Sequence, residues 1–134
     1  MKTTNDVLTD LYKVVSNYTP ILSLDGGIFK QTRPNNSTKE DCIIATIAGV
    51  GAKFVQDGAV SIRIYYADLL QADTHIENTA RATALERILV DLSEVLLSNM
   101  EYCFDIRTRA IYTGDVPEIH QHYAILKLNY KLTY

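Results

Sequence analysis

The sequence has no long uninterrupted hydrophobic run. Its longest apolar stretch, Cys42 to Val50, is broken by Thr46 and Gly49, whereas a helix that spans a bilayer needs about 20 apolar residues. We therefore expect no membrane-spanning segment. The first residues, Met1 to Asp10, are polar and lack an apolar core after a basic start, so we also expect no secretory signal there.

Basic residues are not in excess either. Thirteen Lys and Arg stand against sixteen Asp and Glu, which gives a net charge of −3. Proteins that bind nucleic-acid duplexes carry a surplus of positive charge, so we expect no specific nucleic-acid partner, while a local basic patch stays open. The hydrophobic fraction of 47% is typical of a globular chain rather than a disordered one. The length of 134 residues suits a single domain spanning residues 1–134.

Tryptophan is absent and cysteine is scarce, but tyrosine is abundant. Nine Tyr stand beside three Phe and two Cys. Because tyrosine combines an apolar ring with a polar tip, it suits half-buried sheet faces and interfaces. The cysteines, Cys42 and Cys103, both fall in strand-like segments. We expect buried, reduced thiols of a cytoplasmic protein, with a disulfide between adjacent strands as the alternative.

The clearest periodic pattern predicts a long helix over residues 77–99. Its apolar residues recur at helical spacing: Ala80, Ala84, Ile88, Leu92 and Val95, with Leu85, Leu89 and Leu96 beside them. Such a wide apolar stripe is typical of a helix that lies on a sheet. On the other side, Glu77 with Arg81 and Arg87 with Asp91 are four residues apart, and we expect them to pair weakly.

The rest of the chain predicts a second helix and a mainly antiparallel sheet. Residues 4–18 have an apolar face at helical spacing and end at Thr19-Pro20. Alternating or continuous apolar character predicts strands over residues 27–31, 40–50, 59–67, 102–112 and 122–134. Connections are predicted at the loop 32–39, a hairpin tip with the turn pair Asp57-Gly58, the crossover 68–78 and the loop 113–121. The sequence thus predicts an α+β fold with both helices on a four- to five-stranded sheet.

Two short motifs could carry chemistry, and neither is specific. Glu118, His120 and His122 form a Glu-x-His-x-His run, but zinc needs three or four converging ligands, and no spacing brings His75 to join them. We favour a polar loop that enters a strand. Gly49 to Lys53 is interpreted as a turn, since it joins two strands instead of opening a helix as a phosphate-binding loop does. With no nucleophile or paired-carboxylate signature, we expect no enzyme, no metal and no cofactor.

Cationic and aromatic residues gather on the outward side of the predicted strands. They are Arg63 and Tyr65 on one strand, Arg107 and Arg109 on another, and Lys127 and Lys131 on a third. If these strands are neighbours, the residues form one basic face that contains tyrosine. A solvated sheet face is one interpretation. A contact surface for another subunit is an equally open one, because Arg and Tyr are enriched at interfaces, and nucleic-acid binding is a weaker third.

The order of the predicted elements resembles that of a known family. A short N-terminal helix and a first strand lead into the run Arg33-Pro34-Asn35-Asn36-Ser37-Thr38-Lys39-Glu40-Asp41. An apolar strand, a hairpin, a long helix and a final strand pair follow. This order is similar to that of the tail-terminator and tail-completion (neck) proteins of long-tailed bacteriophages, in particular those of phages and prophages of gut Bacteroidetes. The similarity in element order covers nearly the whole chain, and its specific part is that polar run.

The resemblance implies a structural virion protein without catalytic residues. Family members form a ring, usually a hexamer, on the end of the tail tube and present a surface to the head-side connector. The implied partners are therefore copies of the chain itself, tail-tube proteins and head-connector proteins. The implied location is the host cytoplasm during assembly and then the tail or neck of the virion. Under this hypothesis we expect the contacts from two loops and the outward sheet face: Arg33, Asn35, Lys53, Phe54, Arg63, Tyr65, Arg107, Arg109, Lys127 and Lys131.

The alternative hypothesis is a small α+β ligand-binding domain or enzyme with a pocket at the boundary between helix and sheet. A ring, or an assembly that forms on contact with tube subunits, favours the virion protein. A monomer with a deep polar pocket and converging histidines or carboxylates favours the alternative.

Overall fold

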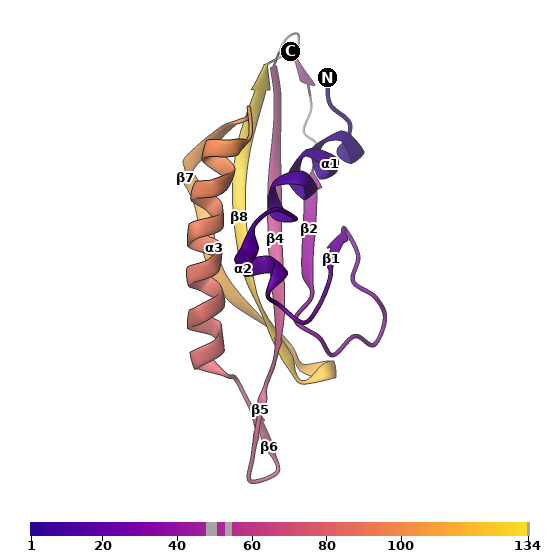
Figure 1. Ribbon diagram of the computed structural model, residues 1–134, viewed down its shortest axis with the longest axis vertical. Helices are drawn as coiled ribbons and strands as arrows, with labels where there is room; N and C mark the ends of the chain where they lie inside the picture. Colours follow the sequence, from indigo (N-terminus) through magenta and orange to yellow (C-terminus); the bar gives the residue numbers. More distant parts are fainter. Residues whose placement is uncertain (48–50, 53–54, 134) are drawn as a thin grey trace.

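The computed structural model describes residues 1–47, 51–52 and 55–133. Within these residues, a mixed sheet has the strand order β1-β2-β4-β8-β7, and the short strand β3 pairs with β4. The helices lie on one face of this sheet, and a separate two-stranded hairpin projects from one end (Figure 1). The predicted α+β class, with helices packed on a mainly antiparallel sheet, is confirmed.

The two main helices start at side-chain caps. In α1 (Thr4–Val15), Thr3 and Asp6 form a reciprocal capping box, and in α3 (Thr79–Asn99) the Asn78 side chain accepts from the backbone of the first turn. The predicted first helix was too long. A separate short helix, α2 (Thr19–Leu22), follows α1 because Pro20 lacks the N–H that a continuing helix would need but fits the start of a new one.

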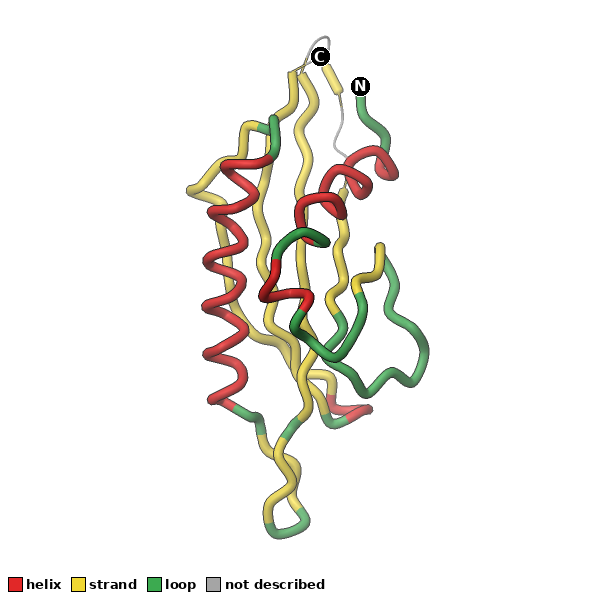
Figure 2. Tube along the Cα trace, viewed as in Figure 1, coloured by secondary structure: helices red, strands yellow, loops and turns green. Residues whose placement is uncertain are grey.

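The strands differ in length and direction. Their bounds are β1 (Ile28–Lys30), β2 (Cys42–Ile47), β3 (Gly51–Ala52), β4 (Val55–Ala67), β5 (Leu69–Gln71), β6 (Thr74–Ile76), β7 (Cys103–Val116) and β8 (Gln121–Thr133). Strands β1 and β2 are parallel, and the other neighbouring strands in the sheet are antiparallel. Every residue of β4 has a partner in β8, so this pair forms the axis of the sheet (Figure 2).

The core lies between the sheet and the two main helices. Alternation with the predicted outward residues Arg63, Tyr65, Lys127 and Lys131 implies inward rows in β4 and β8, and these rows are buried: Val60, Ile62, Ile64, Tyr66, Ala124, Leu126, Leu128, Tyr130 and Leu132. In α3 the buried stripe is centred on Leu85, Leu89, Leu92 and Leu96, all with 0% exposure. Ala80, which was expected in the stripe, is exposed. The stripe is therefore narrower than predicted, and its leucines face the inward rows of the sheet.

Three predicted connections contain strand residues. Asp57-Gly58 lies inside β4 rather than at a turn. Gly58 faces Tyr130, and a Cβ at Gly58 would come within 2.4 Å of that ring, so the glycine allows a cross-strand ring contact. The crossover 68–78 contains the hairpin β5–β6, and β7 extends to Val116, where a single 3-10 turn (Pro117–Ile119) replaces most of the expected loop.

An irregularity in β7 changes which residues face the helices. The pairing with β8 shifts between Asp105 and Ala110, so that residues 106–109 of β7 stand opposite the single residue Leu128 of β8, an enlarged β-bulge. Beyond it, Ile111 pairs with the buried Leu126 and packs against the core, whereas Ile106 is 46% exposed. The predicted outward facing of Arg107 and Arg109 implied the opposite, with Ile106 inward and Ile111 outward. The bulge reverses the facing of the residues beyond it.

Replacing Leu89 by Ala should test the position of the stripe. Leu89 is fully buried and its neighbour Val90 is 44% exposed. We expect Leu89→Ala to lower the free energy of unfolding by about 2–5 kcal/mol, through lost burial and an unfilled cavity. The matched change Val90→Ala should cost less than about 1 kcal/mol. Urea unfolding measures both free energies of unfolding. Equal losses would mean that α3 is rotated about its axis, so that Leu89 is not the buried residue of the pair.

Candidate functional site

The face of the sheet opposite the helices carries a layer of aromatic and cationic side chains. Within the described part of the chain, no α-helix covers this face (Figures 1 and 2). We call it the open face and define it by five residues of β4, β7 and β8: Arg63, Tyr65, Tyr112, Tyr123 and Lys127. Strand alternation places them there, because their neighbours Ile62, Ile64, Ala124 and Leu126 are buried under the helices.

The cations of the open face lie over its rings. The guanidinium carbon of Arg63 is 4.8 Å from the ring centre of Tyr123, and the ring centres of Tyr65 and Tyr123 are 5.7 Å apart. The Lys127 ammonium is 5.6 Å from the ring centre of Tyr112. These distances match cation–π contacts and an aromatic pair. The layer is therefore partly ordered in the single chain.

Two isoleucines are buried under this layer without help from a helix. Ile43 and Ile125 are both in register with Arg63, so they share its face, yet their exposures are 5% and 1%. The long side chains around them exclude water from the centre of the open face. This face thus has an apolar base with a cationic and phenolic surface, which resembles the make-up of interface centres.

Arg33 fixes the loop before β2 to one end of this face. Its guanidinium donates to the Asp41 carboxylate at 2.8 Å, to the Gln121 side chain at 2.7 Å and to the Lys39 carbonyl at 2.9 Å. It also lies 4.0 Å from the ring centre of Tyr65. Arg33 was predicted as a contact residue, but its donors are engaged within the chain, and we assign it the role of holding the loop.

Asp41 is the carboxylate at the centre of this network. Its side chain is only 3% exposed. Burial raises its pKa, but hydrogen bonds from Ser37, Arg33 and the Gly27 N–H outweigh that effect and hold the pKa of Asp41 below its ordinary value. Asp41 is therefore charged at neutral pH, and it links the start of β2 to the polar loop.

The other predicted contact residues are dispersed. Asn35 is exposed on the polar loop and Lys131 on the outward row of β8, while Lys53 and Phe54 lie outside the described residues. Arg107 is 87% exposed and pairs with Asp105. Arg109 bonds to Ser93 and Glu94 of α3. The expectation that Arg107 and Arg109 share one face with Arg63 is wrong for Arg109, because the bulge in β7 turns it toward the helix.

Tyr112 and Tyr123 were not among the predicted contact residues. Tyr112 was placed at the end of its strand, and Tyr123 was not assigned to either row of β8. The sequence feature that could have indicated the position of the Tyr123 ring is the glycine opposite it. Gly114 is in register with Tyr123, and a Cβ there would lie 2.3 Å from the Cζ of that ring. A glycine facing a tyrosine across two strands therefore indicates a ring that lies flat over its neighbour.

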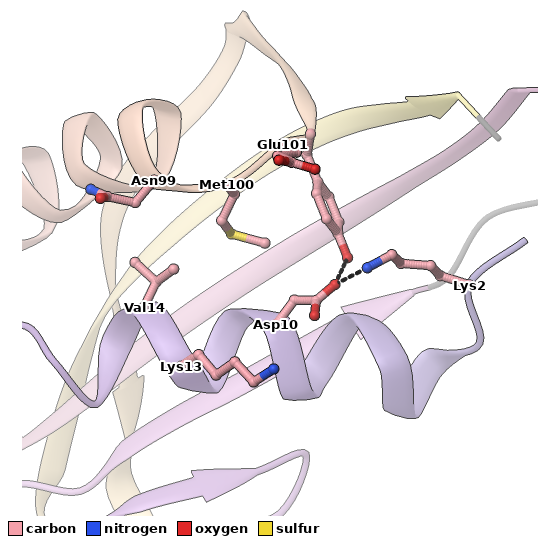
Figure 3. Close-up of a pocket in the computed structure, with 8 residues that line it drawn as sticks. Lys2, Asp10, Lys13, Val14, Asn99, Met100 and Glu101 are labelled. Carbon is pink, nitrogen blue, oxygen red and sulfur yellow. Dashed lines mark hydrogen bonds and ion pairs between the residues drawn. The ribbon is translucent and has the colours of Figure 1, made fainter.

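A separate hollow lies where α1 meets the end of α3. Its volume is about 290 Å³, and Figure 3 shows Lys2 and Asp10 together at one side, with Asn99 at the other. Asp10 pairs with Lys2 and accepts from the Tyr102 hydroxyl at 2.7 Å. Burial raises the pKa of Asp10, but these two bonds outweigh it and leave the pKa below its ordinary value. The negative charge of Asp10 is compensated by Lys2 within the chain. Because its pKa is lowered, Asp10 is a poor general base.

The histidines come together in a way that the sequence did not predict. His75 stacks on His120 with ring centres 3.7 Å apart and planes 9° apart, and His122 pairs with Asp68. His75 therefore does reach the Glu-x-His-x-His run, and it contacts that run by stacking its ring on His120. Among the described residues, no group of three or more His, Cys, Asp or Glu side chains is arranged to hold a metal ion.

The two cysteines differ in environment. Cys42 is buried as expected, and burial, followed by the nearby Asp41 charge, raises the pKa of its thiol to about 12. Cys103 is exposed, which contradicts the expectation of a buried thiol, and neither cysteine forms a disulfide. Strand β7 lies at an edge of the sheet, so among the described residues β8 is its one neighbouring strand.

Comparison with known proteins adds no family assignment, because the chain matches no protein-family model and no curated protein sequence. No helix in the described segments has the length and apolar character to cross a membrane.

Replacing Asp41 by Asn should destabilise the protein in a pH-dependent way. Because the pKa of Asp41 is lowered from about 3.8 on folding, its contribution is fully present above that value and is lost as the pH falls through the lower folded value. We expect Asp41→Asn to cost about 3 kcal/mol at neutral pH, and the difference from the native chain should shrink in acid. Urea unfolding at several pH values measures this, with the exposed Glu118→Gln as the control. A deficit that is constant with pH would contradict the assignment.

Replacing Gly114 by Ala should displace Tyr123. The added Cβ would overlap the ring, so we expect a loss of about 1–3 kcal/mol and a changed near-ultraviolet circular dichroism of tyrosine. In a Tyr123→Ser background the same change should be nearly neutral, because the clash is gone. Equal losses in both backgrounds would mean that strain at Gly114 has another source.

Proposed function

We propose that this protein is a structural virion protein of a tailed phage or prophage that assembles into a ring at the end of the tail tube and joins it to the head connector. The observation that carries the proposal is the open face, a preformed layer of tyrosine and cationic side chains over buried isoleucines. The order of helices and strands, which resembles tail-terminator and neck proteins, supports the same function.

The open face suits a protein–protein contact better than a merely solvated surface would. Arg63 and Tyr123 are interface-enriched residue types that are already in contact. Their order in the single chain lowers the entropy that is lost when a partner binds. A partner would cover the tyrosine rings and meet the cations Arg63 and Lys127, so an acidic, partly apolar surface is the chemistry that fits.

The placement of this face also fits a ring. The helices occupy one side of the sheet and the open face the other, so the open face of one subunit can meet an unlike surface of the next, away from the outer sides of α1 and α3. Contacts between unlike surfaces propagate from copy to copy and close when the rotation permits. Strand β7 at the edge of the sheet, 14 residues long, supplies such an unlike surface through its backbone groups.

A second candidate function is ligand binding at the hollow between α1 and α3. Lys2, Lys13 and the Tyr102 hydroxyl line it, which would suit a small anion. The internal pairing of Lys2 with Asp10 weakens this interpretation. Isothermal titration with inorganic phosphate and small carboxylates separates the two functions, since binding there would favour the alternative.

Reversing charge on the open face should weaken assembly without unfolding the chain. We expect Arg63→Glu with Lys127→Glu to weaken association, with itself or with tail-tube subunits, by about tenfold or more, because repulsion replaces complementarity. Light scattering after size separation, with and without tube subunits from the same phage genome, measures the association. The melting temperature serves as the check on folding.

The matched control places the same charge change on the helix side. Lys13→Glu with Arg87→Glu alters two exposed residues of α1 and α3 and should leave association through the open face nearly unchanged. If the two double variants assemble equally well, the open face is not the contact surface. If the native chain does not bind tube subunits, the proposed function fails.

A further inference from the structure

The β5–β6 hairpin extends beyond the body of the molecule. Figure 1 shows it projecting past the end of the sheet, and all six of its strand residues are exposed. Three of them are large and apolar: Leu69 is 41% exposed, Leu70 63% and Ile76 39%. An isolated two-stranded ribbon is marginally stable in water, and this one presents apolar side chains to solvent, so its exposed state needs an explanation.

Specific contacts hold the hairpin in a defined direction. At its base the Asp68 N–H donates to the His120 carbonyl at 3.0 Å, and the Asp68 carboxylate pairs with His122. Farther along, His75 stacks on His120. The tip residues Ala72 and Asp73 have φ values of 49° and 63°, which is the turn geometry that matches strand twist. The hairpin is thus an ordered projection rather than a loose loop.

A hollow on the open face has matching chemistry. Its volume is about 350 Å³, and it is lined chiefly by small or apolar residues with two cations at its border: Ala45, Ile47, Ala59, Ser61, Arg63 and Lys127. Ile47 is 75% exposed at this site. A leucine side chain could rest on Ile47 and the small residues, while a carboxylate next to it would meet a cation.

We propose that the β5–β6 hairpin of one copy docks in this hollow of a second copy, with Leu70 on Ile47 and Asp73 beside Lys127. The complementarity is both apolar and electrostatic, because Asp73 makes the hairpin tip acidic and Arg63 and Lys127 make the hollow basic. A hairpin that projects away from its own body cannot reach its own open face, so the contact joins two chains through unlike surfaces. This inference rests on the proposed self-assembly and names the residues that perform it.

Site-directed cross-linking between two different chains tests the contact directly. One chain carries Leu70→Cys and the other Ala45→Cys, and both carry Cys103→Ser, since Cys103 is exposed and Cys42 is buried. After mixing and mild copper–phenanthroline oxidation, we expect a disulfide-linked heterodimer in at least about tenfold excess over the control, because docking raises the effective thiol concentration. The control replaces Leu70→Cys by Leu22→Cys, since Leu22 is 58% exposed on the helix side.

Exchanging two charges across the contact tests whether a lost cross-link is caused by misfolding. Asp73→Lys on the hairpin chain should reduce the cross-link to the control level, because the new ammonium group would face the ammonium group of Lys127. Lys127→Asp in the chain that carries Ala45→Cys should restore the cross-link when this chain is mixed with the Asp73→Lys variant of the chain that carries Leu70→Cys. Restoration requires that the two side chains meet, so a merely structural role for Asp73 would not produce it.

The outcomes are separable from those of the proposed function. Equal cross-linking of the Leu70 and Leu22 variants, or no restoration by the charge exchange, overturns the hairpin contact. If association with tail-tube subunits persists in that case, the proposed function stands with a different interface. If the hairpin contact forms but the protein never binds tube subunits, self-association is retained and the phage function fails.

Discussion

The complete pairing of β4 with β8 is the constraint on which the rest of the structure depends. Each residue from Val55 to Ala67 has a partner between Gln121 and Thr133. Because side chains alternate along paired strands, this single register decides which residues meet the helices and which face outward. A slip by one residue would bring Arg63 and Tyr65 into the core and move Ile62 and Ile64 to solvent.

The same register makes the open face more than the leftover side of a sheet. Ile43, Arg63 and Ile125 lie in one row across three strands, so the cation lies directly between two apolar residues. Tyr123 reaches over Gly114 on the next strand. Within the described residues, long side chains of the face itself cover Ile43 and Ile125. The proposals on assembly follow from this property together with the projecting hairpin.

Much of the fold was predictable from the sequence, and the errors have identifiable physical causes. The alternation of β4 and β8 and the apolar period of α3 are strong local signals, and both were confirmed. The bulge in β7 was missed because extra residues in a strand leave no mark on composition. Asp57-Gly58 resembles a turn because the glycine signal is local, whereas its cause, the Tyr130 ring, lies more than 70 residues away.

The candidate site was predictable only in part. Arg63, Tyr65 and Lys127 followed from strand alternation, and the structure places all three on the open face. Arg33 was predicted as a contact residue, but its partners Asp41 and Gln121 are spatial neighbours that no sequence period reveals. The histidine stack likewise depends on the direction of a hairpin within a segment whose composition predicts only a polar crossover.

The bond from Arg33 to Gln121 also bears on the order in which the chain acquires its structure. It joins residues 88 positions apart, and the central strand pair is similarly non-local. While the polypeptide emerges from the ribosome, the Asp41 carboxylate and its arginine have no finished sheet to rest against until the stretch beyond Gln121 is synthesised. Closure of such distant contacts is slow relative to helix formation. During synthesis α1 and α3 can therefore form while one edge of β4 is still unpaired. In this interval, pairing with the wrong strand is the chief hazard.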